Sequence, residues 1–283
     1  MLYLLFEANL TVTSGRGERD NTVPRILVTN DDGVHAPGLL ALKQALARLG
    51  EVVVFAPDRN WSAAGHTKTM HKPLRVEETV LEDGSPALTT NGAPSDCVAL
   101  AVLGLVDSPI DLVVAGINTG ANLGYDITYS GTVAGAMEGV INGIPAIAVS
   151  QEVVVGENAD FSIAADVARR VAELVLQYGL PQDTFLNVNC PARPARIPPE
   201  VVVTRLGRRV YRDVLIRRED PRGKPYYWFG GDPPTGIVEP GTDIGALARG
   251  QVSVTPITMD MTHYRFLADL RTWPLNPRVD EEG

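Results

Sequence analysis

Two adjacent aspartates, Asp31 and Asp32, are the residues of this sequence best suited to chemistry. They follow the short apolar run 26–29, whose length and β-branched residues predict a buried strand. Neighbouring carboxylates repel each other and are costly to dehydrate, and a bound cation is the usual remedy. The alternative is a solvated turn, because Asn, Asp and Gly are the commonest turn residues. The pair is therefore a candidate cation site, with an ordinary turn left open.

Two further polar loops follow predicted strands. The strand expected at 51–56 leads into a loop that contains Ser62, and the strand expected at 111–115 leads into a glycine-rich segment with Asn118 and Asn122. Parallel strands place the loops after their carboxyl ends at one edge of the sheet, so these distant residues can converge there. Carboxylate, hydroxyl and amide oxygens are hard ligands that suit Mg²⁺ or Mn²⁺ rather than zinc.

A third feature, Ser130-Gly131-Thr132, is predicted to open a helix that continues through Val140. The first turn of a helix has free N–H groups and positive dipole character, which together favour an anion such as phosphate. Taken singly, a serine that caps a tightly packed helix is the more frequent explanation of such a segment. The acidic pair and the asparagine loop nearby in the predicted sheet favour the functional interpretation.

The elements that must position these residues alternate between strand and helix. Further strands are expected at 146–149 and 185–188, further helices after Pro37 and at 94–106 and 161–178, and an antiparallel hairpin at 74–80 and 87–90. Such alternation indicates parallel βαβ units in an α/β protein with a doubly wound, mostly parallel sheet.

The chain is expected to have three parts. Residues 1–24 form a flexible N-terminal extension, residues 25–190 the catalytic core, and residues 191–283 a β-rich, extended subdomain, with a late strand at 251–257 returning to the core. The aromatic segment 226–229 within that subdomain is interpreted as a subunit interface or a small core, with base stacking as a weaker alternative.

Composition excludes several classes of protein. A net charge of −9 argues against binding of nucleic-acid polymers through a basic face, but not against phosphate-bearing substrates that bind through a cation. The two cysteines, Cys97 and Cys190, fit no metal or disulfide spacing and indicate free thiols in a cytoplasmic protein. The sequence has no run long enough for a transmembrane helix and no typical signal peptide, so no membrane association is expected.

Several segments together resemble the SurE family of survival-protein phosphatases, which hydrolyse nucleoside 5′- and 3′-monophosphates. The resemblance is dense from residue 25 to 150 and looser through 260. Its motifs are TNDDGVHAPG (29–38), APDRN (56–60), TNGAPSDCV (90–98), AGINTGANLG (115–124) and YSGTVAGAMEG (129–139). It implies a Rossmann-like core, one divalent ion per subunit (Mg²⁺ or Mn²⁺), and a C-terminal extension that exchanges between subunits of a homodimer or homotetramer.

The resemblance also implies roles for individual residues. The family's metal ligands fall on four residues: Asp31, Asp32, Ser62 and Asn118. Its phosphate-proximal residues fall on Asn122, Ser130, Gly131 and Thr132. The loop after Ser62 varies within the family, so the substrate preference does not follow from the resemblance.

We therefore expect metal-assisted hydrolysis of phosphomonoesters, a 5′-nucleotidase activity, with exopolyphosphatase activity as an addition. A metal-polarised water is the expected nucleophile, and either Asp31 or Asp32 orients or deprotonates it as the catalytic carboxylate. His66 is a weaker candidate for contact with the leaving group, and His35 is interpreted as part of a turn. A receiver-like regulatory module is the less favoured alternative, and a non-catalytic nucleotide- or metal-binding protein with the same pocket remains open.

Overall fold

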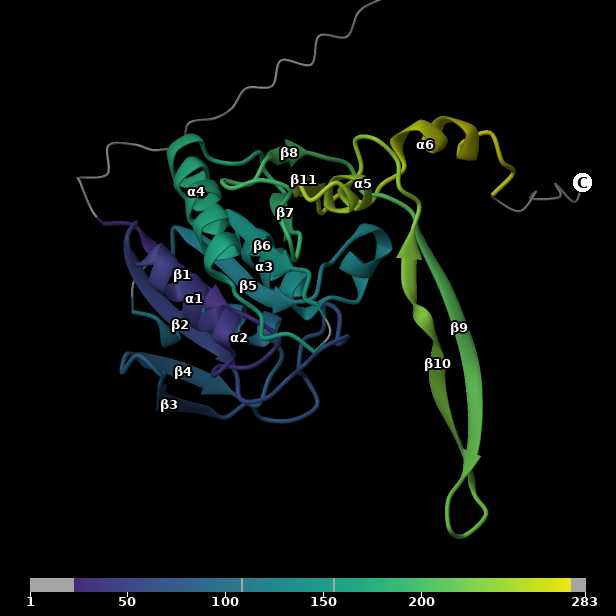
Figure 1. Cartoon of the computed structure of the whole chain (residues 1–283), viewed down its shortest axis with the longest axis horizontal. Helices are drawn as coiled ribbons and strands as arrows, with labels where there is room; N and C mark the ends of the chain where they lie inside the picture. The colour runs from purple at the N-terminus through teal and green to yellow at the C-terminus, as the bar shows by residue number, and fades with distance from the viewer. Residues whose placement is uncertain (1–22, 108, 155, 276–283) are drawn as a thin grey trace, which may run out of the picture.

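The structure is a computed structural model that describes residues 23–107, 109–154 and 156–275 (Figure 1). The predicted N-terminal extension therefore lies outside the described residues, apart from its last two positions. Within the described residues the elements follow this order: β1 (Arg25–Thr29), α1 (Pro37–Leu46), β2 (Glu51–Pro57), β3 (Val76–Val80), β4 (Pro86–Thr90), α2 (Pro94–Leu100), β5 (Leu112–Thr119), α3 (Gly131–Ile141), β6 (Ala146–Gln151), α4 (Ser162–Tyr178), β7 (Thr184–Cys190), β8 (Val201–Val203), β9 (Arg209–Glu219), β10 (Pro225–Gly236), α5 (Asp243–Ala248), β11 (Val252–Thr258) and α6 (Tyr264–Leu270).

The central sheet of the described part of the chain has nine strands in the order β3-β4-β2-β1-β5-β6-β7-β11-β8. The run from β4 to β7 is parallel throughout, whereas β3 is antiparallel to β4 and β11 is antiparallel to β7. Strand β1 lies between β2 and β5, so the chain winds outward from β1 in both directions. In such sheets ligands bind beyond the carboxyl ends of the strands next to this reversal. The predicted doubly wound, mostly parallel sheet is confirmed.

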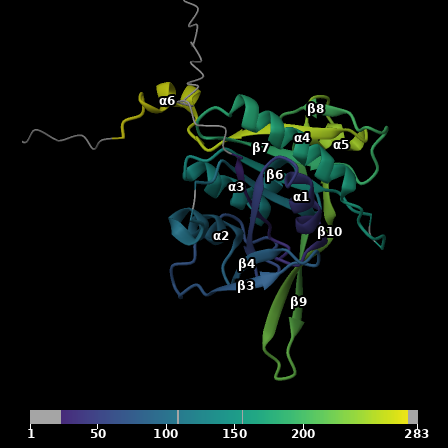
Figure 2. The same cartoon turned by 90° about the vertical axis from the view of Figure 1, so that its left-hand side faces the viewer.

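Helices α1 and α4 lie on one face of the sheet, and helices α2 and α3 lie on the other (Figures 1 and 2). On one face α1 and α4 bury a stripe of apolar residues against the strands, and Leu39, Leu42 and Leu46 of α1 are completely buried at the helical spacing that the sequence shows. On the other face α2 and α3 pack together, with Val98 and Val133 in a second apolar cluster. The many small residues of α3 let it lie close to the strands, so the start of this helix reaches the edge of the sheet.

The helix predicted at 94–106 is shorter than expected. Helix α2 ends at Leu100, and a π-helical turn follows over Ala101–Leu105. Gly104 within that turn has φ +121°, a conformation that glycine adopts without strain and that no helix can continue through. Val102 still packs against the second apolar cluster, whereas Leu105, which follows Gly104, is exposed.

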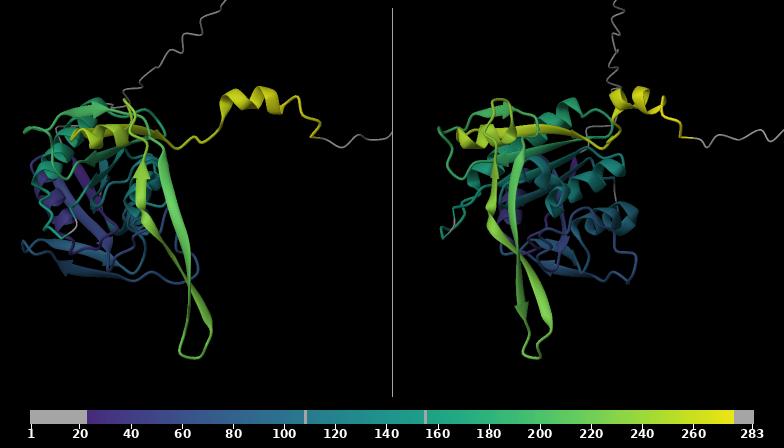
Figure 3. Two further views of the ribbon diagram at one scale, coloured as in Figure 1. Left: turned by 45° about the vertical axis from the view of Figure 1, so that its right-hand side comes forward. Right: turned by 90° about the vertical axis from the view of Figure 1, so that its right-hand side faces the viewer.

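The C-terminal part leaves the body of the protein and then returns to it. Strands β9 and β10 form a separate antiparallel hairpin that projects far from the central sheet, and we call residues 209–236 the arm (Figures 1 and 3). The chain then forms the short helix α5, which the sequence patterns did not predict, and β11 pairs with β7 and β8. Helix α6 also extends away from the body and has no buried residue (Figure 3).

Large apolar side chains of the arm face solvent. Trp228 and Phe229 are 63% and 89% exposed, and several neighbours on both strands are also exposed. A monomer rarely exposes so many contiguous aromatic and aliphatic groups unless another surface covers them. None of the helices within the described residues has the length and apolar character needed to span a membrane.

Candidate functional site

The turn after β1 is built by Asn30, a residue that the sequence reasoning left without a role. Its buried side chain both donates to the carbonyl oxygen of Gly33 (3.0 Å) and accepts from the N–H of Gly33 (3.2 Å). Gly33 has φ +106°, and a β-carbon there would press against the backbone of Arg59. The turn is thereby locked in one conformation, and its two aspartates leave the end of the strand in fixed directions.

The two aspartates have different surroundings. Asp31 is only 3% exposed, and its Oδ1 atom accepts a hydrogen bond from the hydroxyl of Thr132 (2.5 Å). Burial raises the pKa of Asp31, and the Thr132 hydrogen bond opposes this rise while the neighbouring charge of Asp32 adds to it. Asp32 is half-buried and accepts from the N–H of Thr119 (3.0 Å) and the amide of Asn60 (3.2 Å). A carboxylate has about four lone-pair positions, so each aspartate retains capacity to bind a cation.

A cavity of about 300 Å³ opens at this edge of the sheet, and five of the residues proposed from the sequence line it. They are Asp31, Ser62, Asn118, Asn122 and Ser130. The other three proposed residues do not line it. Asp32 holds the two loops beside it, Gly131 packs against the side chain of Asp31, and Thr132 is completely buried.

Two hydrogen bonds orient the loop after β2, which contains Ser62, and the loop after β5, which contains Asn118. The N–H of Trp61 donates to the carbonyl oxygen of Asp31 (2.7 Å), which places Ser62 next to the acidic turn. The amide nitrogen of Asn118 donates to the carbonyl oxygen of Gly120 (2.8 Å), so its amide oxygen is the atom available to a ligand. Ser62 and Asn118 therefore supply a hydroxyl and an amide oxygen to the same cavity as Asp31.

Strand β7 fixes the position of Asn122 through residues that the sequence reasoning missed. Asn189 accepts from the N–H of Asn122 (2.8 Å), and both Asn187 and Asn189 donate to its carbonyl oxygen. The side chain of Asn122 in turn donates to the hydroxyl of Ser150 (2.8 Å). Two asparagines at alternate positions of a buried strand share one face, and that spacing was the signal available in the sequence.

The start of α3 has the character of an anion site. Ser130 is the N-cap, and its hydroxyl accepts from the N–H of Val133 (3.1 Å). The predicted helix start is confirmed, and Ser130 lines the cavity together with the acidic turn. The positive end of the helix dipole therefore lies close to the buried carboxylate, an arrangement that suits a cation and an anion bound side by side.

The donor set fits a hard divalent cation. Among the described residues no group of three or more His, Cys, Asp and Glu side chains could hold a metal ion, so a soft, zinc-type cluster does not compete. The cavity instead combines a carboxylate with hydroxyl and amide oxygens, and the carboxylate of Asp32 lies next in sequence. These are the ligands that Mg²⁺ and Mn²⁺ prefer.

The base of the arm contacts the same cavity. Asp126, which lines it, pairs with the guanidinium of Arg209 (2.5 Å) and accepts from the hydroxyl of Tyr211 (2.7 Å). The aromatic segment 226–229 lies farther along the arm and is not part of the cavity lining. His35 is exposed on the turn, and His66 binds Glu138 instead of lining the cavity.

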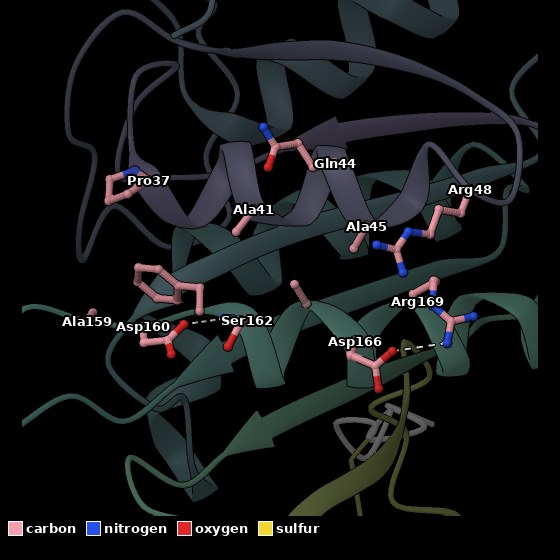
Figure 4. Close-up of a pocket in the computed structure, with 12 residues that line it drawn as sticks. Pro37, Ala41, Gln44, Ala45, Arg48, Ala159, Asp160, Ser162, Asp166 and Arg169 are labelled. Atoms are coloured by element: carbon pink, nitrogen blue, oxygen red, sulfur yellow. Dashed lines mark hydrogen bonds and ion pairs between the residues drawn. The ribbon is translucent and has the colours of Figure 1, made fainter. Parts of the chain in front are cut away.

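A larger cavity, of about 450 Å³, lies between α1 and α4 on the outer face of the sheet (Figure 4). Both of its carboxylates are engaged, because Asp160 accepts from the N–H of Ser162 and Asp166 pairs with Arg169. Size alone therefore does not identify the site. The smaller cavity has the convergent oxygen ligands and the helix N-terminus.

Fold and site together define an α/β protein with a candidate cation and anion site at the topological switch of a doubly wound sheet. The family described as "Survival protein SurE" matches residues 26–213, and the chain belongs to that family. Proteins named "5'-nucleotidase SurE" from Herpetosiphon aurantiacus and Chloroflexus aggregans are 56% and 54% identical to it. These matches cover 87% and 88% of the chain and 97% and 98% of the relatives.

A solved structure shows the same fold. The crystal structure of the SurE protein from Aquifex aeolicus matches with a TM-score of 0.73 and 42% identity. The match covers 88% of this chain and 98% of the Aquifex chain. The family resemblance seen in the motifs is thus confirmed over most of the sequence.

Proposed function

We propose that the chain is a 5′-nucleotidase, a metal-dependent phosphomonoesterase that converts nucleoside monophosphates to nucleoside and phosphate. One observation carries this proposal: a buried carboxylate, a hydroxyl and an amide oxygen from three separate loops line one cavity with the N-cap of α3. The names of the relatives from Herpetosiphon aurantiacus and Chloroflexus aggregans support the same activity.

In this proposal Asp31, Asp32, Ser62 and Asn118 hold one divalent cation per subunit, Mg²⁺ or Mn²⁺. When bound, the cation supplies Lewis-acid polarisation of a phosphoryl oxygen and a water of lowered pKa. Ser130, Gly131 and Asn122 bind the remaining phosphoryl oxygens, with the free N–H groups at the start of α3 as donors. Thr132 acts behind them, because its hydroxyl donates to Asp31.

A catalytic carboxylate must accept the proton of the attacking water, and Asp31 and Asp32 are the candidates. Asp31 lines the cavity whereas Asp32 does not, so Asp31 is the carboxylate nearer to a water bound there. Asp32 keeps its two hydrogen bonds to Thr119 and Asn60, and these bonds hold the second and third loops at the site. We therefore assign proton transfer to Asp31 and loop positioning to Asp32.

The proposal extends to substrate range and assembly. Hydrolysis of 3′-monophosphates and of polyphosphate ends uses the same phosphoryl contacts, so both belong to the proposed activity. The exposed apolar side chains of the arm support a homodimer or homotetramer in which arms are shared between subunits. A cytoplasmic location stays part of the proposal, and the two free, buried thiols support it.

The activity is tested by phosphate release from a panel of nucleoside 5′- and 3′-monophosphates, with EDTA, Mg²⁺ or Mn²⁺, for the wild type and Asp31→Asn. Release that requires both the metal and Asp31 is the expected result. Binding of nucleotide or Mn²⁺ without release under any metal would instead identify a non-catalytic binding protein. Light scattering on the wild type and Phe229→Ser tests the assembly, which the arm variant should weaken.

A further inference from the structure

A buried glutamate lies on the helix that forms the anion site. Glu138 of α3 is only 3% exposed and lies eight residues after Ser130, about 12 Å along the helix. A carboxylate at such a position is costly unless donors surround it. The donors come chiefly from another part of the chain, the loop 58–75, which joins β2 to β3 and contains Ser62. Glu138 therefore links the loop to α3.

Three side chains donate to the carboxylate of Glu138. His66 Nε2 lies 3.0 Å from Oε2, and Lys68 Nζ lies 3.3 Å from Oε1. Asn142, one turn farther along α3, donates to Oε1 from 3.3 Å. An ionised carboxylate only accepts hydrogen bonds, so Nε2 of His66 carries the hydrogen. The His66 hydrogen bond lowers the pKa of Glu138 against the opposing effect of burial, and Lys68 adds to the lowering.

The loop is held on both sides of Ser62. Before it, the N–H of Trp61 donates to the carbonyl oxygen of Asp31 (2.7 Å). After it, the N–H of Gly65 donates to the carbonyl oxygen of Tyr129 (2.9 Å), and His66 follows immediately with its contact to Glu138. Ser62 thus lies in a short span fixed between the turn that carries Asp31 and the residue before the N-cap of α3, and the contact between His66 and Glu138 adds a side-chain anchor directly after that span.

This arrangement separates His66 from the chemistry. Its Nε2 atom is engaged by Glu138, and the residue does not line the cavity that contains Asp31 and Ser130. A role as general acid is therefore not supported by the geometry. The effect of His66 on the site passes through the position of the loop.

We propose that Glu138 is a positioning residue, which holds the loop 58–75 through His66 and Lys68 so that Ser62 is presented to the cation site. This inference rests on the proposed function, because it assigns Ser62 to the cation. Loss of the contact removes one of the anchors on the C-terminal side of Ser62. The hydrogen bond of Gly65 to Tyr129 and those of Thr69 to Asp96 remain, so the loop loosens around residues 62–68, while the carboxylates and the start of α3 stay in place. The expected consequence is weaker cation binding, with the rate at saturating cation retained.

The experiment measures Mn²⁺ binding by calorimetry for the wild type, Glu138→Gln, His66→Ala and the double variant. Each single variant should raise the Mn²⁺ dissociation constant about tenfold, and the double variant should be no weaker than the weaker single variant, as expected for two residues that act through one contact. With excess Mn²⁺, kcat should return to within about twofold of the wild type. Exchange of the amide hydrogens of residues 61–69 should accelerate in the same variants.

Glu173→Gln is the matched control, because Glu173 is an exposed glutamate of α4 that pairs with Arg169. It should leave Mn²⁺ binding unchanged. If Glu138→Gln does not fold, Mn²⁺ binding is measured for His66→Ala and Lys68→Met instead, because these variants remove the loop residues that contact Glu138.

The outcomes separate the two proposals. Unchanged Mn²⁺ affinity in Glu138→Gln and His66→Ala, with hydrolysis by the wild type, would overturn the positioning role and leave the proposed function standing. The expected loss of Mn²⁺ affinity without hydrolysis by the wild type would support the positioning role and overturn the proposed function. A wild type that binds no Mn²⁺ would overturn both.

Discussion

Thr132 donates its hydroxyl hydrogen to the Oδ1 atom of Asp31 across 2.5 Å, although the two residues are 101 positions apart in the sequence. The contact joins the first turn of α3 to the turn after β1. It stabilises the ionised form of a buried carboxylate whose pKa is otherwise raised by burial. The helix that begins at the proposed anion site therefore also contacts the carboxylate of the proposed cation site.

Thr132→Val removes this donor with almost no change of side-chain shape. The pKa of Asp31 should then rise further, so the acidic limb of the pH–activity profile should move to higher pH. A hydrogen bond to a charged group contributes about 1.5–3 kcal/mol, so the acidic limb should move by about one to two pH units. Phosphate release measured across pH at saturating Mn²⁺ checks this, with Thr132→Ser, which keeps the donor, as the control. An unmoved acidic limb would contradict the assigned role.

Gly131→Ala should damage the site more than the fold. A β-carbon at Gly131 would lie 2.7 Å from Cβ of Asp31, so the carboxylate must shift. Overpacking of this kind costs about 1–3 kcal/mol of unfolding free energy. Gly139→Ala is the control, because a β-carbon there is also crowded, at 3.0 Å from Val113 and 3.1 Å from Ala146, but lies away from the site. Both variants should lose stability in urea titrations, whereas only Gly131→Ala should lose Mn²⁺ affinity.

Asp243→Asn should weaken the hydrogen bonds that connect the start of α5 with Gly124, in the loop after Asn122, and with Gly207, just before the arm. The buried carboxylate accepts from the N–H of Gly124 (2.8 Å) and of Gly207 (2.7 Å) as well as from that of Ile244. An asparagine presents an N–H₂ group to one of these donors, which costs about 1–3 kcal/mol of unfolding free energy. Urea unfolding measures the loss, and Asp232→Asn on the exposed arm should be neutral. Equal stability of the two variants would contradict a stabilising role for the hydrogen bonds of Asp243.

The two cysteines should resist thiol reagents in the native state. Burial raises the pKa of Cys190 to about 12 and the pKa of Cys97 well above its ordinary value. The thiolate is the reactive form, so near pH 8 Cys190 should react with Ellman's reagent about a thousandfold more slowly than an ordinary cysteine, and Cys97 should also react slowly. Both thiols should react promptly in denaturant, which provides the control. Prompt reaction of the native protein would show that one thiol is accessible.

The parallel core was predictable because its signals are local. Apolar runs such as 26–29 and 146–149 lie in β1 and β6, and the leucine spacing after Pro37 marks the buried face of α1. The change from α2 to a π-helical turn after Leu100 was not predictable from spacing, and neither was the end of the helical path at Gly104, which adopts φ +121°. Helix α5 was missed because it is short, and its packing and N-cap stabilise it more than helix propensity does.

The sequence by itself determined which chemical groups follow each strand. Asp31, Ser62 and Asn118 come after strands β1, β2 and β5, and parallel strands bring such loops to one edge of the sheet. The residue types alone predicted that these loops offer hard oxygen ligands and that a helix starts at Ser130.

Only the tertiary structure decided which side chains meet. Thr132 faces Asp31 instead of the cavity, and His66 faces Glu138, 72 positions away, instead of the substrate site. Side-chain direction depends on how α3 packs against the strands and on where the loop 58–75 is held. Those contacts join residues far apart in the chain, and packing of the whole domain selects them, whereas strand and helix signals come from neighbouring residues.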